Sequence, residues 1–177
     1  SMLAFLFLHR YYNGKQEDAG EFLQRLLHSV TGAPTLHSLV TGVDIPELCC
    51  CGDGCMYRRS TPHEPFNTVI LNLKKDNGLI IADVQEGLSL YMPDEVMQSN
   101  YVWDCPECRS SRPPRKHHNI VKVPDVLIVQ LCRWDVASEI IRDVIPVNSS
   151  VEFHSVKYSL RSSILHIGDS PKQGHYV

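Results

Sequence analysis

Apolar residues recur with helical spacing in one early segment of the chain, residues 18–30, DAGEFLQRLLHSV. Asp18 and, three residues later, Glu21 form the capping-box signal for the start of a helix. The same Asp-x-x-Glu spacing opens residues 83–92, DVQEGLSLYM, and predicts a second, shorter helix. The apolar positions of the first helix follow the i, i+3, i+4, i+7 pattern of a helix with one face on a core, and they are Ala19, Phe22, Leu23, Leu26, Leu27 and Val30.

Short runs of apolar and β-branched residues dominate the rest of the chain and predict strands. Residues 66–73, FNTVILNL, end at the turn KKDNG. Residues 125–134, DVLIVQLCRW, form a continuous apolar run, which is typical of a strand buried on both faces. Early helices followed by strands that look antiparallel indicate an α+β fold. Further short strands are expected in residues 140–147, 151–160 and 162–167.

Length, charge and the first residues exclude several classes of protein. The 177 residues suffice for about one domain with a real core. A net charge of -3 argues against broad electrostatic binding of nucleic acid. The opening LAFLFL is far shorter than the roughly 20 residues of a membrane helix, and no basic segment precedes it as in a signal peptide. We therefore expect no membrane association and an intracellular location, in the cytoplasm, the nucleus or both.

Seven cysteines, an odd number, include six in two tight clusters, which favours metal binding over disulfides. The CPEC motif lets Cys105 and Cys108 chelate one tetrahedral Zn²⁺. The first cluster, CCCGDGC, offers Cys55 together with one of three adjacent cysteines. Cys51 is preferred because metal sites tolerate its three-residue spacing from Cys55, but Cys49 and Cys50 stay open. The alternative, small buried hydrophobes or remnants of a site, is disfavoured because free adjacent thiols on a loop are reactive. Cys132 lies in a predicted strand and is assigned to the core.

Six motifs occur in an order that resembles the ubiquitin-specific proteases, papain-like cysteine peptidases that cut ubiquitin from its conjugates. KQEDAGEFLQRLL is similar to the family's Q-x-D-A-x-E-F-L box, and YVWDCPEC is similar to its second zinc knuckle. The stretch YSLRSSILHIGDSPKQGHYV resembles the family's segment that ends in G-H-Y. The resemblance spans Gln16 to Val177. Its other three motifs are EPFNTVILNL, DVQEGLSLYMPDEV and VPDVLIVQLCRW.

This resemblance implies a papain-like fingers, palm and thumb fold with antiparallel palm strands. Residues 1–177 would form one incomplete catalytic domain, with a thumb helix region in 16–40, fingers with zinc knuckles in 41–118 and palm strands in 119–177. His175 matches the catalytic histidine, which deprotonates a cysteine thiol. His166 matches an earlier histidine of the family and is expected to be a satisfied palm residue.

Four further residues are implied to bind ubiquitin: Gln16, Asp18, Glu21 and Gly174. The carboxylates of Asp18 and Glu21 would face the arginines of the ubiquitin C-terminal tail, where charge-assisted hydrogen bonds are strong. The two acidic residues can also cap the helix at the same time. Gly174 would leave room for the tail, because a glycine allows a second backbone to approach closely.

The predicted function is thiol-dependent hydrolysis of the isopeptide bond at the ubiquitin C-terminus, with ubiquitin and ubiquitinated proteins as partners. In the family the nucleophilic cysteine lies upstream of the box that begins here at Gln16, and none of the fifteen residues before Gln16 is a cysteine. We therefore expect this chain to supply the catalytic histidine and to be inactive alone. A truncated domain is favoured over an inactive, zinc-stabilised pseudo-enzyme that binds ubiquitin. A zinc-ribbon nucleic-acid-binding module is the least favoured alternative.

Overall fold

The structure is a computed structural model that describes residues 18–29, 34–98, 100–133, 140–170 and 173–177. The chain divides into two compact units. Unit 1 combines Ser1–Leu39 with Ser159–Val177, and unit 2 is Val40–Tyr158. Gln16, one of the predicted ubiquitin-binding residues, lies outside the described residues.

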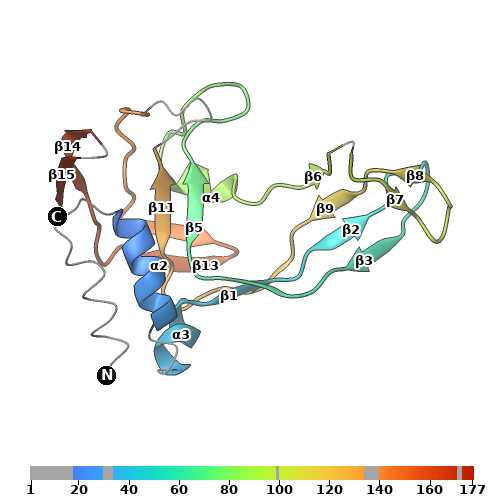
Figure 1. The fold of residues 1–177 in the computed structure, drawn as a ribbon, viewed down its shortest axis with the longest axis horizontal. Coiled ribbons are helices and arrows are strands. Elements are labelled where there is room, and N and C mark those ends of the chain that lie inside the picture. The colour runs from blue at the N-terminus through green and yellow to red at the C-terminus, as the bar shows by residue number, and fades with distance from the viewer. Residues whose placement is uncertain (1–17, 30–33, 99, 134–139, 171–172) are drawn as a thin grey trace. The chain divides into compact units, whose positions relative to one another are not determined.

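Unit 1 contains helices near its start and a strand pair near its end (Figure 1). The predicted first helix is confirmed as α2 (Ala19–Ser29), and a short helix α3 (Pro34–Val40) follows. The capping signal is confirmed as well, because the Glu21 backbone N–H donates to Asp18 Oδ1 at 2.8 Å. Strands β14 (His166–Ser170) and β15 (Gln173–Tyr176) pair antiparallel.

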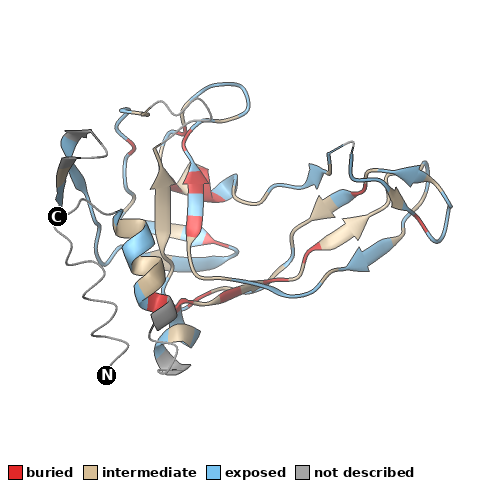
Figure 2. Cartoon of the chain, in the orientation of Figure 1, coloured by how far each residue is buried: buried red, intermediate tan, exposed pale blue. Residues whose placement is uncertain are grey.

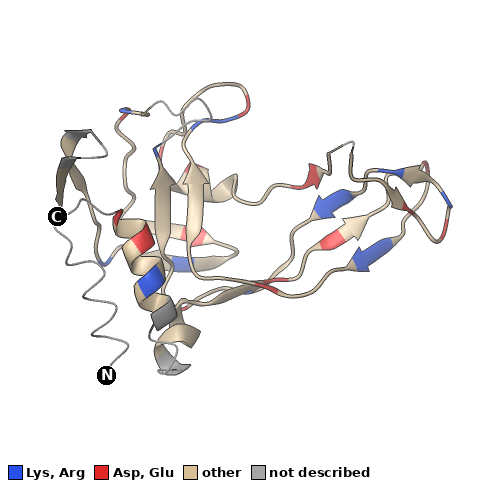
Figure 3. Cartoon of the chain, in the orientation of Figure 1, with Lys and Arg blue, Asp and Glu red and all other residues tan. Residues whose placement is uncertain are grey.

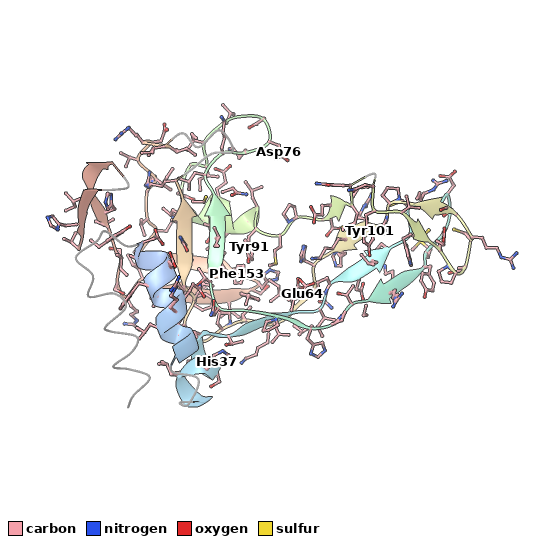
Figure 4. The ribbon with its side chains drawn as sticks, viewed as in Figure 1. His37, Glu64, Asp76, Tyr91, Tyr101 and Phe153 are labelled. Carbon is pink, nitrogen blue, oxygen red and sulfur yellow. The ribbon has the colours of Figure 1, made fainter. Side chains whose placement is uncertain are left out.

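The core of unit 2 is built around β5 (Val69–Asn72), whose residues alternate between buried and exposed (Figure 2). Helix α4 (Val84–Ser89) and the hairpin of β12 (Ser150–Phe153) and β13 (Val156–Ser159) pack with it. The ring of Phe153 lies 5.9 Å from that of Tyr91 (Figure 4). The buried apolar cluster comprises Val69, Leu71, Leu73, Ile81, Val84, Leu88, Ile145 and Phe153.

The central strand pair departs from the antiparallel expectation. Strand β11 (Val129–Cys132) pairs parallel with β5, with Val129 opposite Val69 and Cys132 opposite Asn72. Parallel neighbours require a long crossover connection, and here the chain supplies one by running through the strands of residues 95–122 before it returns. All four residues of β11 are half-buried, so the burial expected on both faces is only partial.

Residues 140–147 were predicted to form a strand, but the described residues 140–149 contain none. The guanidinium of Arg133 donates to the carbonyl oxygens of Ile141 and Asp143 at 3.2 and 2.8 Å. The Arg133 side chain thus forms hydrogen bonds with two backbone carbonyl groups that would otherwise pair with a neighbouring strand. Among the apolar residues of this segment, Ile145 is buried in the core of unit 2, whereas Val144 and Val147 are 89% and 48% exposed.

Two further antiparallel sheets extend unit 2. The connecting sheet has the order β10-β1-β4 and is formed by β10 (Ile120–Lys122), β1 (Gly42–Asp44) and β4 (Glu64–Phe66). The fingers sheet has the order β3-β2-β9-β6 and is formed by β3 (Arg58–Ser60), β2 (Glu47–Cys49), β9 (Arg115–His117) and β6 (Glu95–Val96). Strands β7 (Trp103–Asp104) and β8 (Ser111–Arg112) form a separate hairpin.

The predicted boundaries of the fingers, residues 41–118, include two elements that pack in the core of unit 2. These are β5, which pairs with β11, and α4, which contacts β12. The division into regions 16–40, 41–118 and 119–177 stays a prediction. Among the described residues, no helix has the length and apolarity needed to cross a membrane.

Candidate functional site

Four cysteine sulfurs gather where the end of β2 meets the β7–β8 hairpin. The Sγ atoms of Cys50, Cys55, Cys105 and Cys108 all lie within 4.8 Å of one another. Cys50 Sγ lies 3.6 Å from Cys108 Sγ, and Cys55 Sγ lies 3.8 Å from Cys105 Sγ. A tetrahedral zinc ion with Zn–S bonds of 2.3 Å requires sulfurs about 3.8 Å apart. The two measured separations therefore fit a four-thiolate zinc centre.

Local turns on both sides aim these sulfurs inward. In the first loop, the Gly52 N–H donates to Cys50 Sγ at 3.2 Å, and the Cys55 N–H donates to the Gly52 carbonyl at 3.0 Å. Gly52 also permits a close approach, since a Cβ there would lie 2.9 Å from Cys108 Sγ and 3.3 Å from Cys50 Sγ. A larger residue at position 52 would push the two loops apart.

The second loop closes through backbone hydrogen bonds. The Arg109 N–H donates to the Cys105 carbonyl at 2.9 Å, and the Cys105 N–H donates to the Ser110 carbonyl at 3.0 Å. Arg109 adopts a left-handed conformation with φ 58°. This tight turn brings Cys105 and Cys108 to the same side, as the C-x-x-C spacing predicted.

The structure differs from the predicted ligand set at one position, because it brings Cys50 rather than Cys51 into the group. Consecutive residues of an extended chain point in opposite directions, so two adjacent cysteines cannot both face the same centre. The Cys51 thiol lies instead 4.0 Å from the carbonyl oxygen of Cys49. The number of residues before Cys55 does not distinguish Cys50 from Cys51 as the ligand. The glycine two positions after Cys50, whose N–H reaches that sulfur, is the signal that could have done so.

The electrostatics of the group favour a bound cation. Hydrogen bonds from the Ser110 hydroxyl and backbone N–H lower the pKa of Cys108 to about 6. The Tyr57 backbone hydrogen bond lowers the pKa of Cys55, but burial and three neighbouring sulfurs outweigh it and raise that pKa to about 12. Sulfurs this close cannot all carry negative charge without a counter-ion. Zinc held by all four would supply a structural crosslink between the loops, since no position is left for a substrate.

His175 is presented on the β14–β15 pair, directly opposite Ile167, and its side chain is exposed. Leu165 and Val177 exchange two backbone hydrogen bonds, of 2.8 and 2.9 Å, at the end of this pair. An accessible imidazole on a hydrogen-bonded strand meets the first requirement for a general base, which must reach the proton that it abstracts.

The residues beside His175 explain the glycine before it. A Cβ at Gly174 would lie 2.6 Å from the Ile167 carbonyl oxygen and would collide with the ring of His166. That ring also lies 5.0 Å from the ring of Tyr176, which is opposite His166 in the strand pair. The space above Gly174 is therefore taken by a side chain of this protein, and a steric reason for the glycine exists in the hairpin itself.

The two predicted acidic residues lie at the start of α2. Asp18 is exposed and caps the helix, and the Glu21 carboxylate forms an exposed ion pair with Arg25 one turn later. Capping uses one oxygen of Asp18 and leaves the other open to a cationic partner. Glu21 could bind such a partner only in competition with Arg25.

A family model described as ubiquitin carboxyl-terminal hydrolase matches residues 4–177. The chain belongs to the ubiquitin carboxyl-terminal hydrolase family. Ubiquitin carboxyl-terminal hydrolase 23 of Arabidopsis thaliana is 25% identical over 194 aligned positions, which cover 94% of this chain and 22% of that protein. Ubiquitin carboxyl-terminal hydrolase 19 of Homo sapiens is 41% identical over 66 positions, 37% of this chain and 5% of its own length.

Solved structures show the same fold. The SAGA DUB module bound to monoubiquitin contains a chain with a TM-score of 0.76 and 23% identity. The SAGA DUB module bound to ubiquitin aldehyde gives a TM-score of 0.75 and 21% identity. Each alignment covers 92% of this chain but only 40% and 41% of the two solved chains, respectively. The α+β, papain-like architecture expected from the sequence is confirmed.

Proposed function

We propose that this chain is the histidine-bearing, ubiquitin-binding part of a thiol-dependent deubiquitinase, which hydrolyses the isopeptide bond at the ubiquitin C-terminus. The observation that carries the proposal is the family match over residues 4–177 together with an exposed His175 on a strand pair. The solved relatives bound to monoubiquitin and to ubiquitin aldehyde support ubiquitin as the partner.

His175 acts as the general base in this proposal. Its imidazole takes the proton of a cysteine thiol, and the resulting imidazolium stabilises the thiolate that attacks the isopeptide carbonyl. The same proton then passes to the leaving amine, so that the carbon–nitrogen bond breaks as the thioester forms. In this proposal the chain supplies the histidine and not the nucleophile, because four of its seven cysteines form the sulfur group, Cys49 and Cys51 lie beside that group with their thiols at the carbonyl oxygens of Glu47 and Cys49, and Cys132 lies half-buried in β11.

The remaining predicted residues have supporting roles in the proposal. The exposed carboxylates of Asp18 and Glu21 bind the basic tail of ubiquitin, with Glu21 exchanging Arg25 for a tail arginine. Cys50, Cys55, Cys105 and Cys108 hold structural zinc. Gly174 keeps β15 close to β14, and we include it with Gln16 among residues that border the tail.

Binding is tested by titrating isotope-labelled ubiquitin with the 177-residue chain and following ubiquitin amide resonances. The double variant Asp18→Asn/Glu21→Gln removes two charges but keeps residues that cap helices well, so α2 should persist. We expect it to bind ubiquitin roughly tenfold more weakly. The matched control, Asp76→Asn/Asp125→Asn, removes two exposed carboxylates of unit 2 and should bind normally. An unaffected affinity in the first variant would remove these residues from the site.

Catalysis is tested in the full-length protein with a fluorogenic ubiquitin substrate. His175→Gln should lower kcat by roughly 10²–10⁴-fold while ubiquitin binding stays intact. His63→Gln, a change at another exposed histidine, is the control. A full-length protein that binds ubiquitin but hydrolyses nothing would instead be the pseudo-enzyme.

Binding of single-stranded DNA with a steep salt dependence would favour the nucleic-acid alternative. The charges of the fingers sheet argue against it, because basic and acidic side chains alternate there (Figure 3). Arg58 pairs with Glu47, and Lys116 of the same sheet pairs with Glu64.

A further inference from the structure

A fully buried carboxylate lies where the connecting sheet continues into the fingers sheet. The side chain of Asp44, the last residue of β1, is 0% exposed. Its Oδ2 lies 2.5 Å from His118 Nδ1, and its Oδ1 accepts the Asn119 backbone N–H at 2.8 Å. An ionised carboxylate only accepts, so in a bond to ionised Asp44 the donor is the N–H at Nδ1 of His118. Burying such a charge is costly unless it is fully hydrogen-bonded, so this pair is a strong local constraint.

The backbone hydrogen-bond ladder between strands is interrupted at Asp44 and at His118. The chain passes from β1 to β2 through Ile45 and Pro46, and from β9 to β10 through His118 and Asn119. A bulge between Val43 and Asp44 shifts the register just before the break. Pro46 has no N–H to donate. An interrupted ladder is a place where two sheets can bend relative to each other, because fewer backbone hydrogen bonds hold them.

Few contacts replace the missing ladder. The Ile45 N–H donates to the Asn119 carbonyl at 2.9 Å. Thr61, between β3 and β4, donates its backbone N–H and its hydroxyl to the Pro46 carbonyl at 2.8 and 2.9 Å. At this junction the Asp44–His118 hydrogen bond links β1 with the β9–β10 connection, and the partly exposed Lys116–Glu64 ion pair, at 3.4 Å, also links β9 of the fingers sheet with β4 of the connecting sheet.

We propose that Asp44 and His118 form a latch that holds the fingers sheet at a fixed angle to the connecting sheet, and that they are therefore positioning residues for ubiquitin recognition. The second part rests on the proposed function. A folded partner that contacts both sheets binds best when their angle is set in advance, since ordering a hinge on binding reduces affinity.

The neighbouring residue supplies a matched control. His117 makes the same kind of bond, Nδ1 to Asp94 Oδ1 at 2.6 Å, but the two side chains are 40% and 48% exposed. The side chains of His118 and Asp44 are 11% and 0% exposed. Replacing either histidine by leucine removes one Asp–His bond, but only His118→Leu leaves a buried carboxylate short of a donor.

Residual dipolar couplings of backbone amides in the 177-residue chain report the orientation of the two sheets directly. In the native chain we expect one alignment tensor to fit both sheets. His118→Leu should require two tensors and speed amide exchange at Ile45 and Asn119, whereas His117→Leu should match the native chain. His118→Asn, whose amide N–H can occupy the position of Nδ1–H, should restore the single tensor. Should His118→Leu not fold, Asp44→Asn, which keeps the shape and loses the charge, is measured in its place.

The role in recognition is read from ubiquitin affinity at unchanged zinc content. His118→Leu should bind ubiquitin about tenfold more weakly, and His118→Asn and His117→Leu should bind as the native chain does. A native-like tensor and native-like exchange in His118→Leu would overturn the latch. Separate tensors with unchanged affinity would overturn only its role in recognition. A native chain that binds no ubiquitin would overturn the proposed function, while the couplings would still decide the latch.

Discussion

The Sγ atoms of Cys50 and Cys108 lie 3.6 Å apart although 58 positions separate the two residues in the chain. This contact joins the loop after β2 to the β7–β8 hairpin and brings together two short cysteine motifs that could not each bind zinc alone. Because a metal centre rarely exists in an unfolded chain, the free energy of zinc binding at the proposed site would add to the stability of the folded fingers sheet.

Cys50→Ser and Cys51→Ser distinguish the two adjacent cysteines. We expect Cys50→Ser to lose most of its zinc, because the fourth sulfur is then missing, and Cys51→Ser to retain about one equivalent. Elemental analysis of the purified variants, with release of zinc to a colorimetric chelator, checks the prediction. Equal zinc content in the two variants would show that either thiol can complete the centre.

Gly174→Ala is expected to disturb the β14–β15 pair, because the added Cβ meets the Ile167 carbonyl oxygen and the His166 ring. In the full-length protein, kcat should fall because His175 follows directly on the displaced strand. The double variant Gly174→Ala/His166→Ala should recover part of kcat, since one of the two collisions is gone. A rise in KM with unchanged kcat would instead indicate that the glycine serves only to admit the ubiquitin tail.

Leu71→Ala and Ile70→Ala compare the two faces of β5. Leu71 is 2% exposed in the core, so its truncation should cost about 2–5 kcal/mol of unfolding free energy. Ile70 is 52% exposed, and its truncation should change the stability by roughly 0.5 kcal/mol or less. Urea denaturation followed by circular dichroism measures both, and equal losses would contradict the observed burial.

Acid should weaken the start of α4. The Glu86 backbone N–H donates to Asp83 Oδ1 at 2.8 Å and the Asn148 amide donates to Oδ2 at 3.2 Å, and these bonds lower the pKa of Asp83. The stabilisation is therefore complete above the ordinary carboxyl pKa and is lost as the pH falls through the lower pKa of the folded state.

Asp83→Asn tests this dependence, because it keeps a capping residue and removes the titration. We expect the native melting temperature to decline more steeply than that of Asp83→Asn below about pH 4. Thermal melts between pH 3 and pH 7 provide the comparison. Parallel curves for the two proteins would mean that Asp83 does not contribute to the acid dependence.

Local patterns were sufficient for part of the structure. Helix α2 (Ala19–Ser29) and its capping residue Asp18 were predictable because helix periodicity and capping involve groups only a few positions apart. The strand predicted in 140–147 was wrong because an apolar run does not determine which groups the backbone bonds to, and here two carbonyl oxygens bond to the Arg133 side chain while Ile145 is buried and Val144 is 89% exposed.

The sequence by itself determined the early helix, the two cysteine motifs and, through motifs in the order of a known family, the α+β fold. Only the tertiary structure decided that Cys50 joins the sulfur group, that β5 and β11 run parallel, and that Asp44 meets His118 in the interior. The physical reason is distance along the chain, because each of these relationships joins residues more than fifty positions apart. A short-range sequence pattern cannot predict which of several chemically equivalent side chains will be in contact in the folded protein.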